Sequence, residues 1–151
     1  MNAKQHKAGF TLIELMLVVT IIAILLGIAV PNMLRSKAQA NETSAIGDLR
    51  VIAAGQISYQ SEKYTYGDWD ALTSETDGDG TGFLTKGWVE GRQKAGYIFN
   101  MPLVNNMTFV CFAAPVAAGN TGVNYFRVDP TGIIRYSKEG PPAATDPPVG
   151  G

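Results

Sequence analysis

The residues with the most evident coordination chemistry form a short acidic stretch, "DGDGTG", residues 77–82. Oxygen-bearing side chains at alternating positions, with a glycine at the sharp turn, match the first half of a calcium-binding loop. Such a loop needs a bidentate glutamate at its twelfth position, where this sequence has Trp88. The incomplete motif favours an ordinary surface turn, and calcium bound by Asp77, Asp79 and Thr81 is the alternative interpretation.

Side chains suited to nucleophilic or acid–base catalysis are scarce. The sequence has one histidine, His6, and one cysteine, Cys111, which leaves no partner for an intramolecular disulfide. In "TFVCFAA" the cysteine lies among apolar and aromatic neighbours, a pattern typical of a small buried side chain. No cluster of histidine and cysteine indicates a metal, and the glycine-rich stretch lacks the lysine and following helix of a P-loop. We expect no enzymatic activity and no cofactor other than calcium at the candidate loop.

One carboxylate occupies an unusual place near the N-terminus. From Phe10 to Val30 the only ionisable side chain is Glu14. This stretch, residues 10–30, predicts a transmembrane helix, because about 20 apolar residues at about 1.5 Å each span the roughly 30 Å of a bilayer core. A carboxylate in that environment costs about 2.5–3.5 kcal/mol, so we expect Glu14 to have a partner. The alternative is a plain anchor in which Glu14 snorkels toward the headgroups.

The residues around Glu14 carry a family resemblance. The segment "GFTLIEL", residues 9–15, follows a short basic leader and precedes an unbroken apolar run. It resembles the N-terminus of type IV pilins and of the pseudopilins of type II secretion. The resemblance implies that a prepilin peptidase removes the leader, residues 1–9, by cutting after Gly9, and methylates the new N-terminal residue, Phe10. It also implies that Glu14 meets the Phe10 amine of a neighbouring subunit, which sets the axial register of a filament.

The resemblance further implies where such a chain acts and with which partners. It would reside in the bacterial inner membrane before assembly and then enter a homo-oligomeric filament, or one of related pilins, as a cell-surface pilus or a periplasmic pseudopilus. An inner-membrane platform and an assembly ATPase would be needed. The sequence does not decide whether the filament is a pilus or a pseudopilus, or whether the chain is a major or a minor subunit. A role of the filament in adhesion is also undecided. The alternative is a membrane-tethered or minor-pilin module whose sheet domain captures DNA, polysaccharide or a secreted protein, although a net charge of -1 without a basic patch predicts no nucleic-acid binding.

The element that must position Glu14 is a long helix. After Pro31, small and apolar side chains recur at steps of three and four, which predicts an amphipathic continuation of the helix over residues 31–64. Gly27 and Pro31 lie at the junction. Because proline lacks a backbone N–H, we expect a kink or a locally melted turn there. Two interpretations of this kink stay open. It adapts the helix to packing in a bundle, or Pro31 is an ordinary membrane-helix proline that bends the span without a role in assembly.

The remaining residues, 65–139, predict a loop followed by an antiparallel sheet. Four runs rich in aromatic and β-branched residues predict strands at residues 97–101, 107–114, 123–128 and 133–136. The sequence "DPTG" from Asp129 to Gly132 predicts a tight turn. The segment at residues 140–151 has no periodicity and predicts a flexible tail. The expected fold class is α+β, a long N-terminal helix packed on a small antiparallel sheet, which is also the pilin-like architecture that the resemblance implies.

Overall fold

The computed structural model describes residues 9–74 and 82–150. The chain divides into two compact units, Met1–Arg35 and Ser36–Gly151. Helix α1, Leu12–Lys63, contributes its first part to the first unit and the rest to the second. The predicted long helix is therefore present, and it begins two residues later and ends one residue earlier than its expected bounds.

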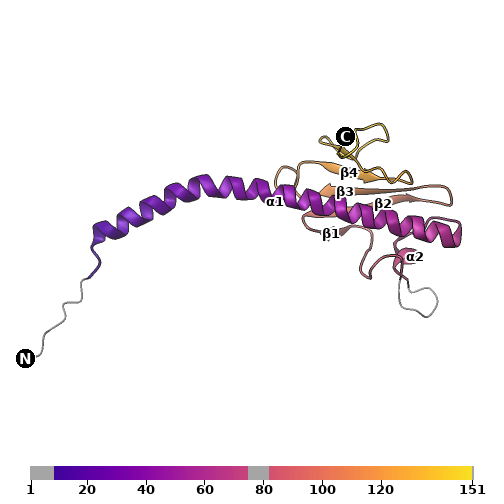
Figure 1. Ribbon diagram of the computed structural model, residues 1–151, viewed down its shortest axis with the longest axis horizontal. Coiled ribbons are helices and arrows are strands. Elements are labelled where there is room, and N and C mark those ends of the chain that lie inside the picture. Colours follow the sequence, from indigo (N-terminus) through magenta and orange to yellow (C-terminus); the bar gives the residue numbers. More distant parts are fainter. Residues whose placement is uncertain (1–8, 75–81, 151) are drawn as a thin grey trace, which may run out of the picture. The chain divides into compact units, whose positions relative to one another are not determined.

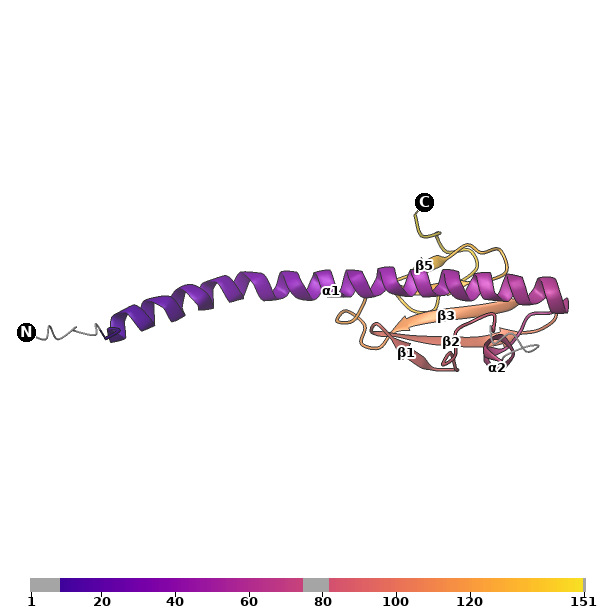
Figure 2. The same ribbon diagram turned by 60° about the horizontal axis from the view of Figure 1, so that its bottom comes forward.

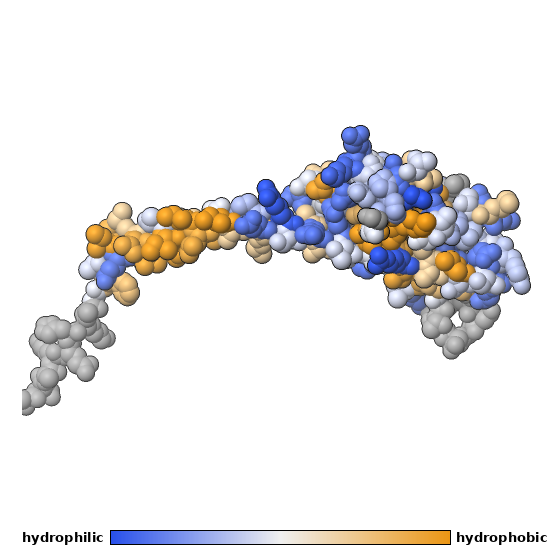
Figure 3. All heavy atoms as spheres, turned by 45° about the horizontal axis from the view of Figure 1, so that its top comes forward, coloured by the Kyte–Doolittle hydropathy of each residue, from blue (hydrophilic) through white to orange (hydrophobic). Residues whose placement is uncertain are grey.

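The first unit presents an apolar helix surface without a cover. From residue 9 to residue 35 the large hydrophobic side chains are all exposed, from 47% at Val18 to 89% at Phe10. By length and composition α1 can cross a membrane, because its apolar window has a mean hydropathy of 2.8. Figure 3 shows this part of the helix as a nearly continuous hydrophobic surface. A helix that is apolar on every side is stable where lipid or other helices surround it.

The helix is unbroken through Gly27 and Pro31, so the locally melted turn expected as one possibility does not occur in this structure. Proline removes one hydrogen bond from the helical ladder, and the helix continues on both sides of Pro31. The Asn32 side chain adds a further bond, because its Nδ2 donates to the Ile28 carbonyl at 3.2 Å. A kink at this junction remains a prediction.

The second unit is built on one antiparallel sheet. Its strands are β1 (Arg92–Lys94), β2 (Tyr97–Val104), β3 (Phe109–Pro115), β4 (Tyr125–Val128) and β5 (Arg135–Ser137), in the order β1-β2-β3-β4-β5. In Figures 1 and 2 the strands lie side by side, and residues 36–63 of α1 run across one face of the sheet. The four predicted strands correspond to β2–β5, and the α+β fold class is confirmed.

Strand β1 was not predicted from the sequence. It pairs with β2 through a tight turn in which Ala95 and Gly96 both have positive φ, 47° and 74°. Two-residue hairpin turns of this kind are signalled by Asn-Gly or Asp-Gly, and Ala-Gly gives a weaker signal. The short polar sequence of β1 also lacks the alternation of a half-buried strand.

A short helix, α2 (Trp69–Thr73), was also missed. Asp68 caps it, because its side chain accepts a hydrogen bond from the Ala71 N–H at 2.8 Å. Gln56 of α1 holds the segment before it: Gln56 Nε2 donates to the Gly67 carbonyl at 2.6 Å and Gln56 Oε1 accepts from the Gly67 N–H at 3.0 Å. This fully buried amide satisfies both backbone groups of one residue.

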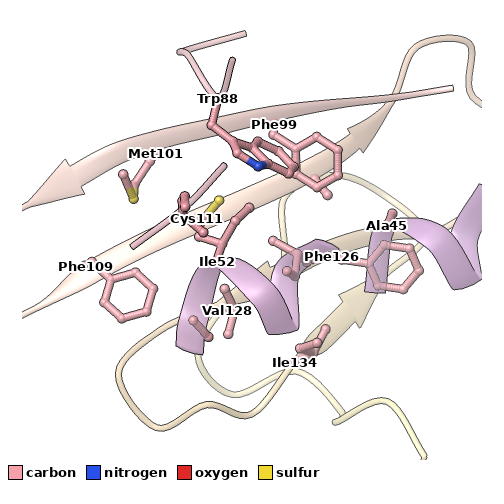
Figure 4. Close-up of a cluster of buried hydrophobic side chains, with 14 of the residues drawn as sticks. Ala45, Ile52, Trp88, Phe99, Met101, Phe109, Cys111, Phe126, Val128 and Ile134 are labelled. Carbon is pink, nitrogen blue, oxygen red and sulfur yellow. The ribbon is translucent and has the colours of Figure 1, made fainter. Parts of the chain in front are cut away.

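The core lies between α1 and the sheet. Ala45, Leu49 and Ile52 of α1 are buried, as the predicted stripe requires, whereas Leu34 belongs to the first unit and is 52% exposed. Figure 4 shows Ile52 directed toward the side chains of the strands. Each fully buried large side chain contributes about 1.5–3 kcal/mol. The other buried members of this cluster are the aromatic residues Trp69, Trp88, Tyr97, Phe99, Phe109 and Phe126 and the smaller or aliphatic residues Ala53, Leu72, Leu84, Met101, Cys111, Ala113, Val128 and Ile134.

The segment after residue 140 is not the flexible tail that its composition predicts. It folds back along β5, where the Tyr136 N–H donates to the Pro147 carbonyl at 3.1 Å and the Val149 N–H donates to the Ile134 carbonyl at 2.8 Å. The Val149 side chain also packs against the core. The pairing uses backbone groups, so the sequence gives no periodic sign of it. Prolines in this segment cannot donate to a further strand, which protects the sheet edge.

Candidate functional site

The best-defined polar site in the first unit is formed by Thr11 and Glu14 at the start of α1. The Thr11 backbone N–H donates to Glu14 Oε2 at 2.9 Å, and the Thr11 hydroxyl donates to the same oxygen at 2.7 Å. In return, the Glu14 N–H donates to the Thr11 hydroxyl oxygen at 3.3 Å. This reciprocal arrangement is a capping box, which satisfies backbone donors that a helix start leaves unpaired.

The capping box gives Glu14 a partner that the sequence analysis did not identify. The signal was present, because a threonine followed three residues later by a glutamate before an apolar run is the sequence signature of this cap. Thr11 also explains why α1 begins at Leu12. In the isolated chain Glu14 is therefore part of a local hydrogen-bonded unit.

The two residues of the expected cleavage site precede the helix. Gly9 and Phe10 are exposed and lie outside regular secondary structure. A Cβ added at Gly9 would contact nothing within 4 Å. An enzyme that needs an extended, accessible backbone could reach this bond, since no helical hydrogen bond has to be broken first. Cleavage at Gly9 and methylation at Phe10 remain predictions.

The candidate calcium ligands Asp77, Asp79 and Thr81 lie outside the described residues. Within residues 9–74 and 82–150, no group of three or more histidine, cysteine, aspartate or glutamate side chains is arranged to hold a metal ion. Calcium at the acidic stretch therefore stays an untested expectation.

Cys111 is a buried free thiol, as its aromatic surroundings predict. Burial raises the pKa of the thiol above its ordinary value, and the negative charge of Glu90 raises it further. Because only the thiolate is a strong nucleophile, this cysteine is chemically inert in the folded chain.

Two polar residues of α1 that the sequence analysis did not single out fix the loop between β3 and β4. Glu42 Oε1 accepts from the backbone N–H groups of Val123 and Asn124 at 2.7 and 3.1 Å, and Glu42 Oε2 accepts from Asn124 Nδ2 at 2.7 Å. Asn41 Nδ2 donates to the Thr121 carbonyl at 2.8 Å. These contacts join residues about eighty positions apart, so no local sequence motif predicts them. They fix the end of the sheet domain to the helix.

Comparison with known proteins decides the family. Residues 4–30 match the family model described as the prokaryotic N-terminal methylation motif. The chain is 33% identical over 104 residues to the type II secretion system core protein G of Pseudomonas aeruginosa, which covers 66% of this chain and 68% of that protein. The chain belongs to the type IV pilin and type II secretion pseudopilin family.

Two further relatives of this pilin-family chain come from surface pili. The type IV major pilin protein PilA of Myxococcus xanthus is 46% identical over 64 residues, 42% of this chain and 29% of that protein. The type IV wide pilus major component PilA4 of Thermus thermophilus is 41% identical over 62 residues, 41% of this chain and 47% of that protein. The chain thus spans less than half the length of these two pilins, and its relatives include both pilus and secretion-system proteins.

Proposed function

We propose that this chain is a structural subunit that polymerises through its N-terminal helix into a type IV pilus or a type II secretion pseudopilus. One observation carries the proposal. The first unit is an apolar helix exposed on all sides, with Glu14 as the single ionisable group between residues 10 and 30, and this segment lies within the match to the methylation motif.

The chemistry of the helix start supports assembly over simple anchoring. Glu14 makes neutral-donor hydrogen bonds with Thr11 in the isolated chain. Cleavage after Gly9 would create a cationic amine at Phe10, and a methyl group would preserve its charge. In a dry bundle of helices, an ion pair between this amine and Glu14 of a neighbouring copy is stronger than it would be in water. Assembly would then exchange the Thr11 contact for an intermolecular ion pair.

The proposed life cycle is the one that membership of the pilin family implies. A prepilin peptidase would cut after Gly9 and methylate Phe10. The subunit would wait in the bacterial inner membrane, held by the apolar part of α1, until a membrane platform driven by an assembly ATPase inserts it into a filament. The filament would be a surface pilus or a periplasmic pseudopilus, made of copies of this chain or of related pilins.

The proposed role is structural and involves no catalysis. The names of the relatives describe pilus components and a secretion-system core protein. We assign no ligand to the sheet domain, and calcium at Asp77, Asp79 and Thr81 stays a separate proposal that a shift of melting temperature with added calcium would test.

Mass spectrometry of filaments sheared from the cell surface tests the proposal. We expect a peptide that begins at Phe10 and carries one added methyl group. Its abundance in sheared filaments would assign the chain to a pilus, and its restriction to a membrane-bound fibre would assign it to a pseudopilus or a minor subunit. An N-terminus that remains uncut in both fractions would overturn the proposal.

A further inference from the structure

The sequence contains the acceptor signal for N-linked glycosylation twice. This signal is an asparagine followed two residues later by serine or threonine, with any residue except proline between them. It occurs at residues 41–43, "NET", and at residues 106–108, "NMT". Because so short a signal also arises by chance, the structural setting of each asparagine decides whether a sugar can be attached.

The first signal lies inside helix α1, and its side chains are engaged there. Asn41 Nδ2, the atom to which a sugar would be attached, donates to the Thr121 carbonyl at 2.8 Å. A Cβ built on Gly96 would lie 2.8 Å from the same nitrogen, so its surroundings are closely packed. The Thr43 hydroxyl donates to the Gln39 carbonyl at 3.0 Å. Asn41 is therefore not available as an acceptor in the folded chain.

The second signal lies in the loop that connects β2 to β3. Residues 105–108 belong to neither strand, and Asn106 and Met107 are exposed. Asn105 fixes the loop backbone, because its Oδ1 accepts from the N–H groups of Met107 and Thr108, both at 2.9 Å. The Asn105 N–H also donates to the Thr108 carbonyl at 2.9 Å. Asn106 thus projects from a loop whose backbone is held by a neighbouring side chain.

The Asn106 amide is held by its oxygen atom and leaves its nitrogen atom free. The hydroxyl of Thr65, just after the end of α1, donates to Asn106 Oδ1 at 2.9 Å. Since Oδ1 and Nδ2 point in different directions from their shared carbon, this bond turns the nitrogen away from Thr65. Within residues 9–74 and 82–150, no group accepts a hydrogen bond from Asn106 Nδ2. A shallow hollow lined by residues 105–108 leaves room for a bulky group.

We propose that Asn106 is an N-glycosylation site, whose substrate is a sugar carried on a lipid-linked diphosphate. In this transfer, Asn106 Nδ2 forms a bond to the anomeric carbon of the sugar. The bond between that carbon and the diphosphate oxygen breaks, and the lipid diphosphate leaves with the bonding electrons. A base of the transferase takes one proton from Nδ2, so the transfer needs no oxidant or reductant.

This inference goes beyond the proposed function and rests on it only for the compartment. N-linked acceptors lie in surface loops of secreted proteins. A pilus or a periplasmic pseudopilus would hold the sheet domain outside the cytoplasm, where such a transfer takes place. The loop belongs to the second unit, whereas Phe10 and Glu14 belong to the first. A sugar at Asn106 would therefore modify the surface of the sheet domain and leave the chemistry of the helix start unchanged.

Peptide mass spectrometry of the chain from the cells that naturally produce it tests the proposal. Trypsin cleaves after lysine and arginine, so Asn106 falls in the peptide of residues 95–127 and Asn41 in the peptide of residues 38–50. We expect a mass excess of whole sugar units on the first peptide, located by fragmentation at Asn106. The second peptide should carry no excess, and a sugar at Asn41 would contradict the argument from packing.

Matched variants separate the acceptor signal from a general effect of substitution. Asn106→Gln removes the acceptor, and Thr108→Ala removes the hydroxyl of the signal but keeps the asparagine, so both should lose the mass excess completely. Thr108→Ser keeps the signal and should keep the excess. Thr43→Ala breaks the signal in α1 in the same way and should leave the excess on the first peptide unchanged. Fragmentation of the natural chain locates the sugar even where a variant fails to fold.

The outcomes distinguish this inference from the proposed function. An unmodified peptide of residues 95–127 in the natural chain, or a mass excess that persists in Asn106→Gln, would overturn the glycosylation site. The proposed function is reported in the same digest by the peptide that begins at Phe10. An uncut N-terminus together with a sugar at Asn106 would overturn the proposed function and support the site, because a membrane-tethered module also reaches that compartment.

Discussion

At the scale of single residues, the Glu14 carboxylate combines two properties that substitution can separate. Its Oε2 atom closes the capping box with Thr11, and its charge makes it suitable for an ion pair. Glutamine can serve as the third residue of a capping box and is uncharged. Comparing a substitution of Glu14 with one of Thr11 therefore shows whether Glu14 only caps the helix or also sets the axial register between subunits.

We expect Glu14→Gln to insert and be cleaved normally but to reduce filament yield more than tenfold. Breaking one side of a buried ion pair costs about 3–5 kcal/mol, because the remaining amine is left uncompensated. Thr11→Ala keeps the charge and loses only the cap, worth about 1 kcal/mol, so its filament yield should fall by a much smaller factor. The measurement is the yield of sheared filaments, with the peptide beginning at Phe10 as the check on cleavage. Equal yields from both variants would show that Glu14 acts only as a cap.

At the scale of elements, the edge of the sheet depends on a turn with a strained residue. Ala95 has a φ of 47°, a left-handed conformation that favours glycine or asparagine. It precedes Gly96 in the hairpin that attaches β1 to β2. β1 in turn is held to α1, because Lys94 Nζ lies 2.6 Å from Asp48 Oδ1. A residue that tolerates positive φ better than Ala95 should therefore stabilise the turn, and with it the connection between the sheet edge and the helix.

We expect Ala95→Asn to raise the free energy of unfolding by about 0.5–1 kcal/mol, because Asn-Gly is the preferred sequence for this turn. Thermal and denaturant unfolding followed by tryptophan fluorescence would measure it. Ala144→Asn, an exposed position outside strands and helices, is the matched control and should change little. A gain of the same size at both positions would mean that the effect does not come from the turn.

The sequence predicted the elements that have strong local periodicity. The long helix and strands β2–β5 carry such patterns, whereas β1 has three residues, of which Arg92 and Lys94 are charged. The tail along β5 is fixed by backbone hydrogen bonds to Tyr136 and Ile134, which do not depend on its side-chain pattern. The elements that were missed are short or are held by backbone hydrogen bonds, so they carry no side-chain periodicity that sequence analysis could use.

At the scale of the whole molecule, the two units differ in whether their apolar side chains are buried within the unit. The second unit buries its own core, including Leu49, Phe99 and Phe109, which are fully buried. The first unit leaves its apolar side chains exposed, so its stable surroundings must come from a membrane or from other chains. Folding stability is thus a property of the second unit, and the proposed assembly would be a property of the first.

The buried titratable groups of the second unit give its stability a defined pH dependence. Burial raises the pKa of Tyr97, with a further contribution from the charge of Glu42, and burial likewise raises the pKa of Cys111. Both groups are acids that are neutral when protonated. The unfolded chain therefore loses these protons first, at about pH 8.5 for cysteine and about pH 10 for tyrosine. Ionisation above these values favours the unfolded state.

We expect the free energy of unfolding to be insensitive to these two groups below about pH 8 and to fall above it, by up to about 1.4 kcal/mol per pH unit for each group that ionises only on unfolding. Denaturant titrations between pH 7 and pH 11 would measure the slope. Cys111→Ala should be less stable at pH 7 because of the cavity, and should lose less stability between pH 8 and pH 9.5 than the natural chain. The same slope in both chains would contradict this assignment to Cys111.

The sequence by itself determined the features that depend on neighbours along the chain: the apolar span, the position of Glu14, the motif from Gly9 to Leu15 and the alternation of the longer strands. The cap between Thr11 and Glu14 was also encoded locally and could have been identified from its spacing. Only the tertiary structure decided that Glu42 holds the loop at Val123, that Lys94 reaches Asp48 and that the terminal segment closes the edge of the sheet. The physical reason is the range of the interactions. Periodicity and capping act between residues a few positions apart, whereas these contacts form only after folding brings distant backbone groups and charges within hydrogen-bond distance.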